Sequence, residues 1–251
     1  MKVMTFNLKH KILEDIFGLW KKRYREIIKY LKKENPDILG VQELTRKGKH
    51  FLKKELKDYQ IIGKRRHSII LTNEYNCLLI KNDYKIISHN TYSLSDKITH
   101  LGRKTKSDKF PRICVVAHIE KDNIKYMVVN THLDNSDTKN KKRLLKIYNK
   151  IVEINKNDDE YLILLGDYNM TLDNKNLKEF SINYKDPFEN NDTSSFTGYP
   201  NIKAIDHIFL DKRLNYKNEK IDINSNDQSY LSDHYPLSCI IERKKWNRLV
   251  K

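Results

Sequence analysis

Tyr-Leu-Ile-Leu-Leu-Gly-Asp-Tyr-Asn, residues 161–169, is the stretch that decides the fold of this chain. The run Tyr161–Leu165 is apolar throughout, which is typical of a strand buried on both faces of a sheet. The run ends at Gly166, and the acid Asp167 follows at once. A carboxylate at the edge of a core is costly unless a partner or a metal ion compensates its charge. The stretch therefore predicts a buried strand that carries an acid to one end of a sheet.

The same change from apolar to polar recurs where other expected strands end. An acid, an amide or a histidine then stands where a turn residue is expected. Besides Asp167 and Asn169, these residues are Asn7, Glu43, His132, Asp206, His207, Asp233 and His234. One acid at a strand end is usually a turn residue or a cap. Repetition at so many strand ends instead indicates hard-cation and phosphate chemistry.

In the rest of the chain, short apolar runs predict more strands than helices. Helical periodicity covers Trp20–Lys33 and Ser136–Ile154, with a weaker helix within 51–59. Strands are expected at Val3–Phe6, Ile38–Val41, 61–62, Ile69–Leu71, Cys77–Ile80, 86–87, Ile113–Ile119, Ile124–Asn130, Tyr161–Leu165, Ala204–Leu210 and Leu237–Ile241. Glu120–Asn123 predicts a hairpin turn, and Ser93–Pro111 a long surface loop. Several strands follow one another without a helix, which favours a mixed α/β or α+β sandwich with antiparallel pairing over a parallel barrel.

Length and composition narrow the class of protein. The 251 residues contain no repeat or linker, so we expect one domain over residues 1–251, acting as a monomer. No apolar run approaches the length of a membrane helix, and Met1–Phe6 does not begin a signal peptide. Cys77, Cys114 and Cys239 lie apart among apolar residues, which predicts reduced core thiols and a cytoplasmic protein.

The charge is strongly positive. The chain has 49 Lys and Arg against 33 Asp and Glu, a net charge of +16. A basic protein attracts polyanions such as nucleic acid. Lys and Asn are abundant while Gly, Ala and Pro are scarce, a pattern that an A/T-rich coding sequence produces by itself. The charge therefore leaves nucleic acid open as a partner without establishing it.

The types of residue at the strand ends suggest particular roles. Glu43 offers only oxygen ligands, which suits Mg²⁺. His132 and His234 can transfer or stabilise protons near neutral pH, and Asp206 can hold a histidine ring in one tautomer. Neither clustered histidines nor paired cysteines offer a zinc or copper site.

Six segments, in order, resemble the motif set of the endonuclease/exonuclease/phosphatase superfamily. They are Thr5–Asn7, Val41–Glu43, Asn130–Asp134, Leu165–Asn169, Ile205–Phe209 and Ser232–Leu237. Each motif alone is weak, but six in the right order between residues 5 and 237 are specific. The resemblance implies a four-layer α/β sandwich of two mostly antiparallel mixed sheets flanked by helices. It also implies a phosphoester hydrolase that uses Mg²⁺, with Mn²⁺ as an alternative.

The resemblance assigns a metal site and an acid that positions or deprotonates the attacking water. Glu43 resembles the principal Mg²⁺ ligand, with Asn7 and Asp233 in support. Asp167 resembles the acid that positions or deprotonates the attacking water, and Asn169 the amide that holds a phosphate oxygen. The family leaves open whether one or two metal ions act.

The resemblance also assigns groups that contact the phosphate. Asp206 resembles the acid that orients His234, which then acts as a base or stabilises the transition state. His132 and Arg112 stand where family members contact the phosphoryl oxygens. The implied reaction is in-line attack of water on a phosphoester.

The substrate stays open at this stage. The segments Tyr92–Ser95, Phe110–Cys114 and Ser195–Tyr199 resemble compact bacterial members near the deadenylase-like exonucleases. Lys9 stands where apurinic-site nucleases usually have an acid, and His132 where they usually have an aromatic residue, which disfavours abasic-site repair. The basic surface favours a nuclease, and one form of this hypothesis is a 3′ exonuclease that acts on single strands.

Two alternatives remain beside the nuclease. One is a phosphatase or phosphodiesterase acting on an inositol, sugar or lipid phosphate. The other is a non-catalytic polyanion-binding module, which would be expected to lack Glu43, Asp167 or His234. A basic groove with aromatic residues, formed by the loops 93–111 and 189–203, would indicate nucleic acid, and a closed pocket a small phosphate.

Other polar residues receive structural interpretations. Asp134 and Asp137 are expected to be acids at a helix N-terminus. His207 is expected to face its strand neighbours. The remaining groups are expected on a solvated helix face (Lys139, Lys141 and Lys142) or at the surface and in packing (His10, His50, His67, His89, His100 and His118).

Overall fold

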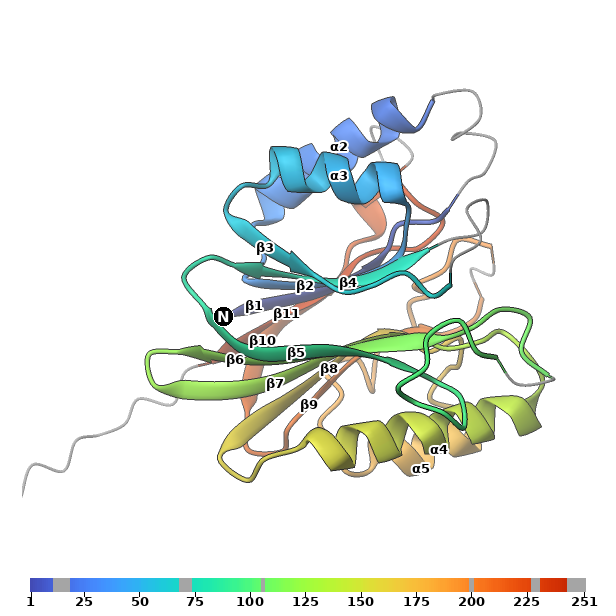
Figure 1. Cartoon of the computed structure of the whole chain (residues 1–251). Coiled ribbons are helices and arrows are strands. Elements are labelled where there is room, and N and C mark those ends of the chain that lie inside the picture. The colour runs from blue at the N-terminus through green and yellow to red at the C-terminus, as the bar shows by residue number, and fades with distance from the viewer. Residues whose placement is uncertain (11–18, 68–73, 105–106, 199–200, 227–230, 243–251) are drawn as a thin grey trace, which may run out of the picture.

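The fold is a stack of two β-sheets with helices on both outer faces (Figure 1). The computed structural model describes residues 1–10, 19–67, 74–104, 107–198, 201–226 and 231–242. The strand expected at Ile69–Leu71 lies outside the described residues, as does Tyr199 of the segment Ser195–Tyr199.

Both sheets are mixed and mostly antiparallel. The first has the order β10 (Asn215–Ile221), β11 (Leu237–Glu242), β1 (Lys2–Asn7), β2 (Ile38–Leu44), β4 (Tyr75–Lys81) and β3 (Tyr59–Ile62). The second has the order β5 (Lys85–Ser93), β6 (Ile113–Lys121), β7 (Ile124–His132), β8 (Glu160–Asp167) and β9 (Asp206–Leu210). The pairs β1–β2 and β7–β8 are parallel and the other pairs are antiparallel.

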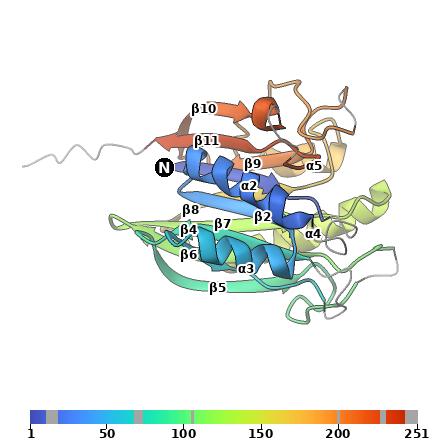
Figure 2. The same cartoon turned by 90° about the horizontal axis from the view of Figure 1, so that it is seen from above.

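Helices cover the outer face of each sheet, which confirms the predicted four-layer sandwich. The helices α2 (Trp20–Glu34) and α3 (Arg46–Glu55) lie on the first sheet, side by side in Figure 2. The helices α4 (Thr138–Asn155) and α5 (Lys175–Ser181) lie on the second, and a 3₁₀ turn covers Ile223–Asn226. Asp137 caps α4 by accepting a hydrogen bond from the Asn140 amide at 2.9 Å, as expected for a helix acid. Within the described residues, none of these helices combines the length and hydropathy needed to cross a membrane.

The core has three layers of apolar side chains. One lies between the two sheets and the others lie under the two pairs of helices. Cys77, Cys114 and Cys239 are buried free thiols within these layers, as predicted. Burial of this apolar surface is the main favourable contribution to folding.

Two elements were not expected from the sequence. The strand β10 reads Asn-Tyr-Lys-Asn-Glu-Lys-Ile and lies at a sheet edge, where most of its side chains are exposed. The helix α5 has only seven residues and begins after Asn174, whose side chain caps it. Neither segment carries the long apolar periodicity that identifies an element from sequence. The weaker helix expected within 51–59 ends at Glu55, because Tyr59 already begins β3.

A buried amide network links the two sheets near one end. The Asn130 side-chain amide on β7 donates to the carbonyls of Val41 at 2.9 Å and Cys77 at 2.8 Å, on two strands of the other sheet. Its oxygen accepts from the Gln42 amide at 2.6 Å. Gln42 Oε1 has no hydrogen-bond partner in the described structure, but these three bonds engage both ends of the Asn130 amide, and buried bonds of this kind favour one arrangement of the sheets. This network therefore fixes how the two sheets align beside the predicted site residues.

Candidate active site

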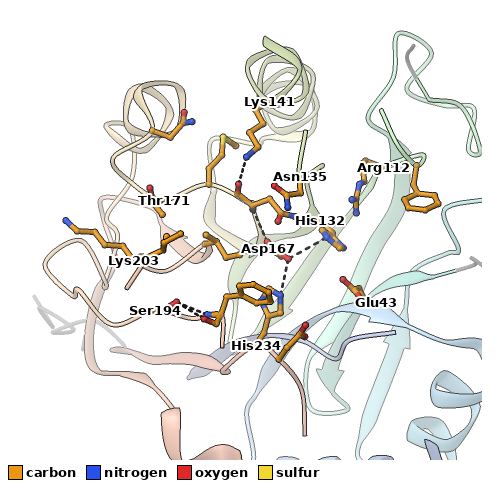
Figure 3. Close-up of a pocket in the computed structure, with 18 of the residues that line it drawn as sticks. Glu43, Arg112, His132, Asn135, Lys141, Asp167, Thr171, Ser194, Lys203 and His234 are labelled. Atoms are coloured by element: carbon orange, nitrogen blue, oxygen red, sulfur yellow. Dashed lines mark hydrogen bonds and ion pairs between the residues drawn. The ribbon is translucent and has the colours of Figure 1, made fainter. Parts of the chain in front are cut away.

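All the predicted site residues meet at one end of the sandwich, around a pocket of about 520 Å³ (Figure 3). Parallel pairing sets His132 beside Asp167, and antiparallel pairing sets Asp167 beside Asp206. Of the predicted site residues, those that line the pocket are Glu43, Arg112, His132, Asp167, Asn169, Asp233 and His234. Asn7 and Asp206 are hydrogen-bonded to lining residues. The carboxyl ends of parallel strands and the amino ends of their antiparallel neighbours share an edge, which explains why segments far apart in sequence converge here.

Asp167 is the centre of this arrangement. Its Oδ2 accepts a hydrogen bond from the Asn7 amide at 3.0 Å and lies 3.5 Å from His132 Nε2 and 3.9 Å from His234 Nε2. Its Oδ1 accepts from the Asn169 backbone amide at 2.9 Å. Burial, and then the charge of Asp206, raise the pKa of this carboxyl to about 7. Asp167 can therefore exchange a proton near neutral pH.

His234 is held as an imidazolium by acids. Its Nδ1 donates to Asp206 Oδ2 at 2.8 Å, and the Ser195 hydroxyl donates to the same oxygen at 2.7 Å. Burial lowers the pKa of His234, but the charge of Asp206, its hydrogen bond, and the charges of Asp167 and Asp233 outweigh that effect and raise the pKa to about 10. The Nε2 edge of the ring therefore carries positive charge toward the pocket at neutral pH.

His132 has the opposite character. Burial lowers its pKa well below the usual histidine value, and the nearby charges of Arg112, Arg66 and His234 lower it further. The ring is therefore neutral at pH 7. The site thus combines one charged and one neutral imidazole on either side of the Asp167 carboxylate (Figure 3).

Glu43 lies where β2 leaves its regular register. A β-bulge separates Val41 from Leu44 in the pairing with β4, and Glu43 has a left-handed backbone with φ of 55°. This conformation is strained for a residue other than glycine, and such strain concentrates at functional sites. The bulge turns the carboxylate to the pocket, where it accepts from the His10 backbone amide at 2.8 Å and from the Asn7 amide at 3.2 Å.

The Glu43 carboxylate offers oxygen ligands that suit a hard cation. Burial, and then the charge of Glu74, raise the pKa of the Glu43 carboxyl. Among the described residues, neutral amides are the hydrogen-bond partners of Glu43. Asp167, Asp206 and His234 also offer ligand atoms within 4.8 Å of one another, but His234 and Asp206 are already bonded to each other. Carboxylate oxygens are the ligands that Mg²⁺ prefers in proteins.

Arg112 is a buried pocket residue. Its Nε and Nη2 donate to Asp134 Oδ1 at 2.9 Å and 2.8 Å, while its Nη1 is buried without a hydrogen-bond partner in the described structure. Asp134 therefore does not act as a helix acid, contrary to the expectation, because α4 begins only at Thr138. A donor without a partner beside these candidate catalytic groups fits an anionic ligand.

Arg66 and Glu74 belong to the same wall and were missed from the sequence. They form an ion pair at 2.7 Å, and the Arg66 guanidinium lies 4.5 Å from the centre of the Phe110 ring. His10, also expected to be unrelated to the site, contributes the amide that binds Glu43. None of these residues lies in a recognisable motif, so no sequence signal identifies them.

The turn after β8 fixes Asn169 and depends on Gly166. Gly166 has φ of +147°, and a Cβ there would lie 2.2 Å from the Thr131 carbonyl oxygen on β7. Only glycine fits such a close approach with a positive φ. Asn169 then adopts φ of 51°, and its side-chain amide donates to the Leu133 carbonyl at 2.9 Å. The motif Gly-Asp-Tyr-Asn therefore sets the backbone conformation after β8 and also supplies polar side chains to the pocket.

Lys141 corrects a second expectation. It was expected on a solvated helix face with Lys139 and Lys142, yet it lines the pocket and donates to the Asn169 carbonyl at 2.9 Å (Figure 3). Burial lowers its pKa, and the charges of Asp167 and Asp134 oppose this. The first turn of α4 points one lysine inward, while Lys139 and Lys142 are exposed.

His207 follows the structural interpretation. Its Nε2 lies 2.8 Å from the Met170 carbonyl oxygen, its Nδ1 lies 3.3 Å from Asp186, and its ring stacks on Phe209. The ring is buried and fully engaged in packing. It is therefore a structural histidine next to the catalytic Asp206 candidate.

Sequence comparison agrees with this geometry. The sequence model of the Endonuclease/Exonuclease/phosphatase family matches residues 4–234, and the chain belongs to this family. Its members are phosphoester hydrolases that depend on a divalent metal ion, and this chain is an enzyme of that class. No curated protein sequence matches the chain at a significant level.

Several solved structures share the fold. A mannosyl-6-phosphatase of Bacteroides thetaiotaomicron has a TM-score of 0.81 and 21% identity over 97% of this chain and 100% of that chain. The human Nocturnin catalytic domain with bound sulfate has a TM-score of 0.76 and 18% identity over 96% and 94%. TDP2 of D. rerio with a single-strand DNA product has a TM-score of 0.74 and 17% identity over 97% and 99%. At these identities the likeness establishes the fold and not the substrate.

Proposed function

We propose that this chain hydrolyses phosphodiester bonds of single-stranded nucleic acid, with water as the nucleophile and Mg²⁺ as the cofactor. One observation carries the chemistry: a single carboxylate oxygen, Asp167 Oδ2, lies within 4 Å of both a charged and a neutral histidine. That arrangement provides a proton acceptor for water and a cation for the developing charge in one place.

Glu43 and Asn7 are the proposed first residues of the metal site, with Asp233 predicted in support. Bound Mg²⁺, or Mn²⁺ in its place, would neutralise charge on the phosphoryl oxygens. Two observations support the fit: the Glu43 carboxylate, carried on a left-handed backbone, accepts from neutral amides among the described residues, and the charge of Glu74 raises its pKa. The Asn7 amide bridges Glu43 and Asp167, and so ties the metal site to the group that handles water.

Asp167 is the proposed acceptor of the proton from the attacking water. The imidazolium of His234, fixed by Asp206, would stabilise charge on the phosphate through Nε2. His132 would donate a neutral N–H to a phosphoryl oxygen or assist the leaving group. Because Asp206 binds Nδ1 of His234, the ring presents Nε2 to the pocket throughout the reaction.

Arg112 and Asn169 are the proposed phosphate contacts. The partnerless Arg112 Nη1 supports this role, because a buried donor without an acceptor is costly unless a ligand supplies one. Asn169 is held in a left-handed turn at the pocket wall, where its backbone position cannot shift freely. Both residues would therefore orient the phosphate rather than take part in proton transfer.

Basic hollows beside the pocket favour nucleic acid as the substrate. Lys64, Arg65 and His67 line a hollow with Tyr75, next in sequence to the pocket residues Arg66 and Glu74. Lys139, Lys142, Arg143 and Lys146 line another on the first turns of α4, beside Lys141. Cationic surface next to a catalytic pocket suits the backbone of a single strand, and the Tyr75 ring in the first hollow offers one surface on which a base can stack. Cleavage from a 3′ end is the form of the reaction we propose to test first.

A phosphatase acting on a sugar, inositol or lipid phosphate is the second candidate. The pocket of about 520 Å³ supports it, because this volume is typical of small-molecule sites. One structural neighbour is a mannosyl-6-phosphatase and another holds a single-strand DNA product, so relatives of similar fold are found with both kinds of molecule.

We further propose that residues 1–251 form one domain that acts as a monomer in the cytoplasm. The apolar layer shared by the two sheets supports a single folding unit. The three buried free thiols support a reducing compartment.

The test is Mg²⁺-dependent product release from a substrate panel. The panel contains single-stranded RNA, single- and double-stranded DNA, inositol phosphates, sphingomyelin and a plain phosphomonoester. We expect cleavage of single strands by the wild type, loss of cleavage in Asp167→Ala and His234→Ala, and full activity in the control His89→Ala, an exposed histidine of β5. Turnover confined to a small phosphate would replace the nuclease with the phosphatase. Near-wild-type turnover by folded Asp167→Ala or His234→Ala would refute the site itself.

A further inference from the structure

Asp233, predicted as a metal ligand, already has a cation. The Lys9 ammonium donates to Asp233 Oδ2 at 2.5 Å. The Asp233 side chain lines the pocket and is 18% exposed. The charge that a metal ion would neutralise at this carboxylate is therefore neutralised by the chain itself.

The fold holds Lys9 in this position. Its backbone adopts φ of 48°, and its amide donates to Asn7 Oδ1 at 3.0 Å. The buried Arg23 guanidinium donates to the carbonyls of Leu8 at 2.5 Å, Lys9 at 2.9 Å and Leu231 at 2.9 Å. Arg23 thus joins the segment that carries Lys9 to the segment that precedes Asp233.

A second link joins the same two segments. The Ser232 hydroxyl donates to the Asn7 carbonyl at 2.6 Å, one residue before Asp233. Surface ion pairs are weak partly because two long side chains must be ordered to form them. Here the two backbones are already fixed, so the pair forms at a smaller entropic cost. A metal ion at Asp233 would have to displace the ammonium and then stay close to its positive charge.

Glu43 differs from Asp233 in this respect. In the described part of the chain, its carboxylate accepts hydrogen bonds from two neutral amides; the charge of Glu74 raises its pKa, and the charge of His234 lowers it. The hydrogen bonds to the Glu43 carboxylate therefore come from neutral amides, whereas the Asp233 carboxylate is bound by an ammonium.

We infer that Lys9 takes the place of a second metal ion at Asp233, so that this enzyme binds one divalent ion, on the Glu43 side. The inference rests on the metal site proposed at Glu43. It changes the role of Asp233 from metal ligand to partner of Lys9. Lys9 then acts as a positioning residue that sets the metal stoichiometry.

The test counts bound metal on the full chain without substrate. Mn²⁺ is titrated into the protein, and free Mn²⁺ is followed by electron paramagnetic resonance. We expect one equivalent for the wild type and two for Lys9→Asp, which sets a second carboxylate beside Asp233. Asp is among the residues that tolerate a left-handed backbone. The matched control is Lys29→Asp, which makes the same charge change at the exposed Lys29–Glu26 pair of α2 and should keep one equivalent.

Two further variants keep the inference testable if Lys9→Asp fails to fold. Glu43→Gln should weaken Mn²⁺ binding by about 10-fold or more, because it removes the ligand itself rather than an outer partner. Asp233→Asn should keep one equivalent with a Kd within about threefold of the wild type, a change of roughly 0.7 kcal/mol.

The outcomes separate the two proposals. Two equivalents in the wild type, one in folded Lys9→Asp, or equal weakening by Asp233→Asn and Glu43→Gln would overturn the inference and leave a metal site in place. No Mn²⁺ binding by the wild type, or no effect of Glu43→Gln, would overturn the proposed metal site together with the inference.

Discussion

Asp167 should make the enzyme less stable at alkaline pH than it would be without this acid. Burial and the charge of Asp206 raise the pKa of Asp167 from 3.8 to about 7. A group whose folded pKa is raised contributes stability that is fully present below the unfolded pKa and lost as pH rises through the folded pKa. Because one pKa unit corresponds to about 1.4 kcal/mol, ionising Asp167 costs the fold roughly 4 kcal/mol above pH 7.

Asp167→Asn removes this titration while keeping the shape of the side chain. Between pH 5 and pH 8 the wild type loses about 3 kcal/mol of stability, the part of this cost that is incurred above pH 5, and the variant does not. We therefore expect the variant to gain about that much stability over the wild type on going from pH 5 to pH 8. The measurement is urea unfolding of both proteins at both pH values in EDTA, so that metal binding does not contribute.

The control is Asp159→Asn, an exposed carboxylate paired with Lys125, which should show no such pH-dependent gain. The reasoning fails if the stability difference between Asp167→Asn and the wild type is the same at pH 5 and pH 8 within about 0.5 kcal/mol, the additivity error of such comparisons. Greater stability of the variant, together with loss of its activity, would show that the fold bears a cost for the proposed catalytic acid.

Three other predictions follow from the same geometry. In Asp206→Asn, the pKa of His234 should fall from about 10 by roughly 1–3 units, as seen by NMR titration of the ring proton, and an unchanged titration would refute the role of Asp206. Gly166→Ala should destabilise the fold by roughly 2–4 kcal/mol in urea unfolding, because a Cβ would lie 2.2 Å from the Thr131 oxygen, and a neutral effect would show that β7 and β8 can separate there. Lys141→Gln should raise KM for the substrate about 10-fold through loss of a positive charge in the pocket wall, whereas Lys142→Gln on the exposed side of α4 should not, and equal effects would assign both to general charge.

The main strands and the family were accessible from the sequence because both leave local signals. Apolar runs such as Tyr161–Leu165 predict strands from spacing alone. Six short motifs in order carried the family, although none of them is specific by itself. The elements that were missed, β10 and α5, are short or polar, and the fold rather than their own sequence makes them regular.

The interpretation of Lys141 went wrong for a related reason. Three lysines close together on one turn of a helix look alike in the sequence. Only the direction of each side chain distinguishes them, and that depends on how α4 lies against the second sheet. Lys141 turns to the pocket while its neighbours remain exposed.

The sequence by itself determined which residues end the strands, and so which chemical groups the enzyme has. The tertiary structure decided which of these groups compensate one another. Lys9 and Asp233 are 224 positions apart, and Arg66 and Glu74 lie outside any recognisable motif, yet each pair forms an ion pair at the pocket. The strength of an interaction between charges depends on their distance and burial, and the local sequence determines neither quantity.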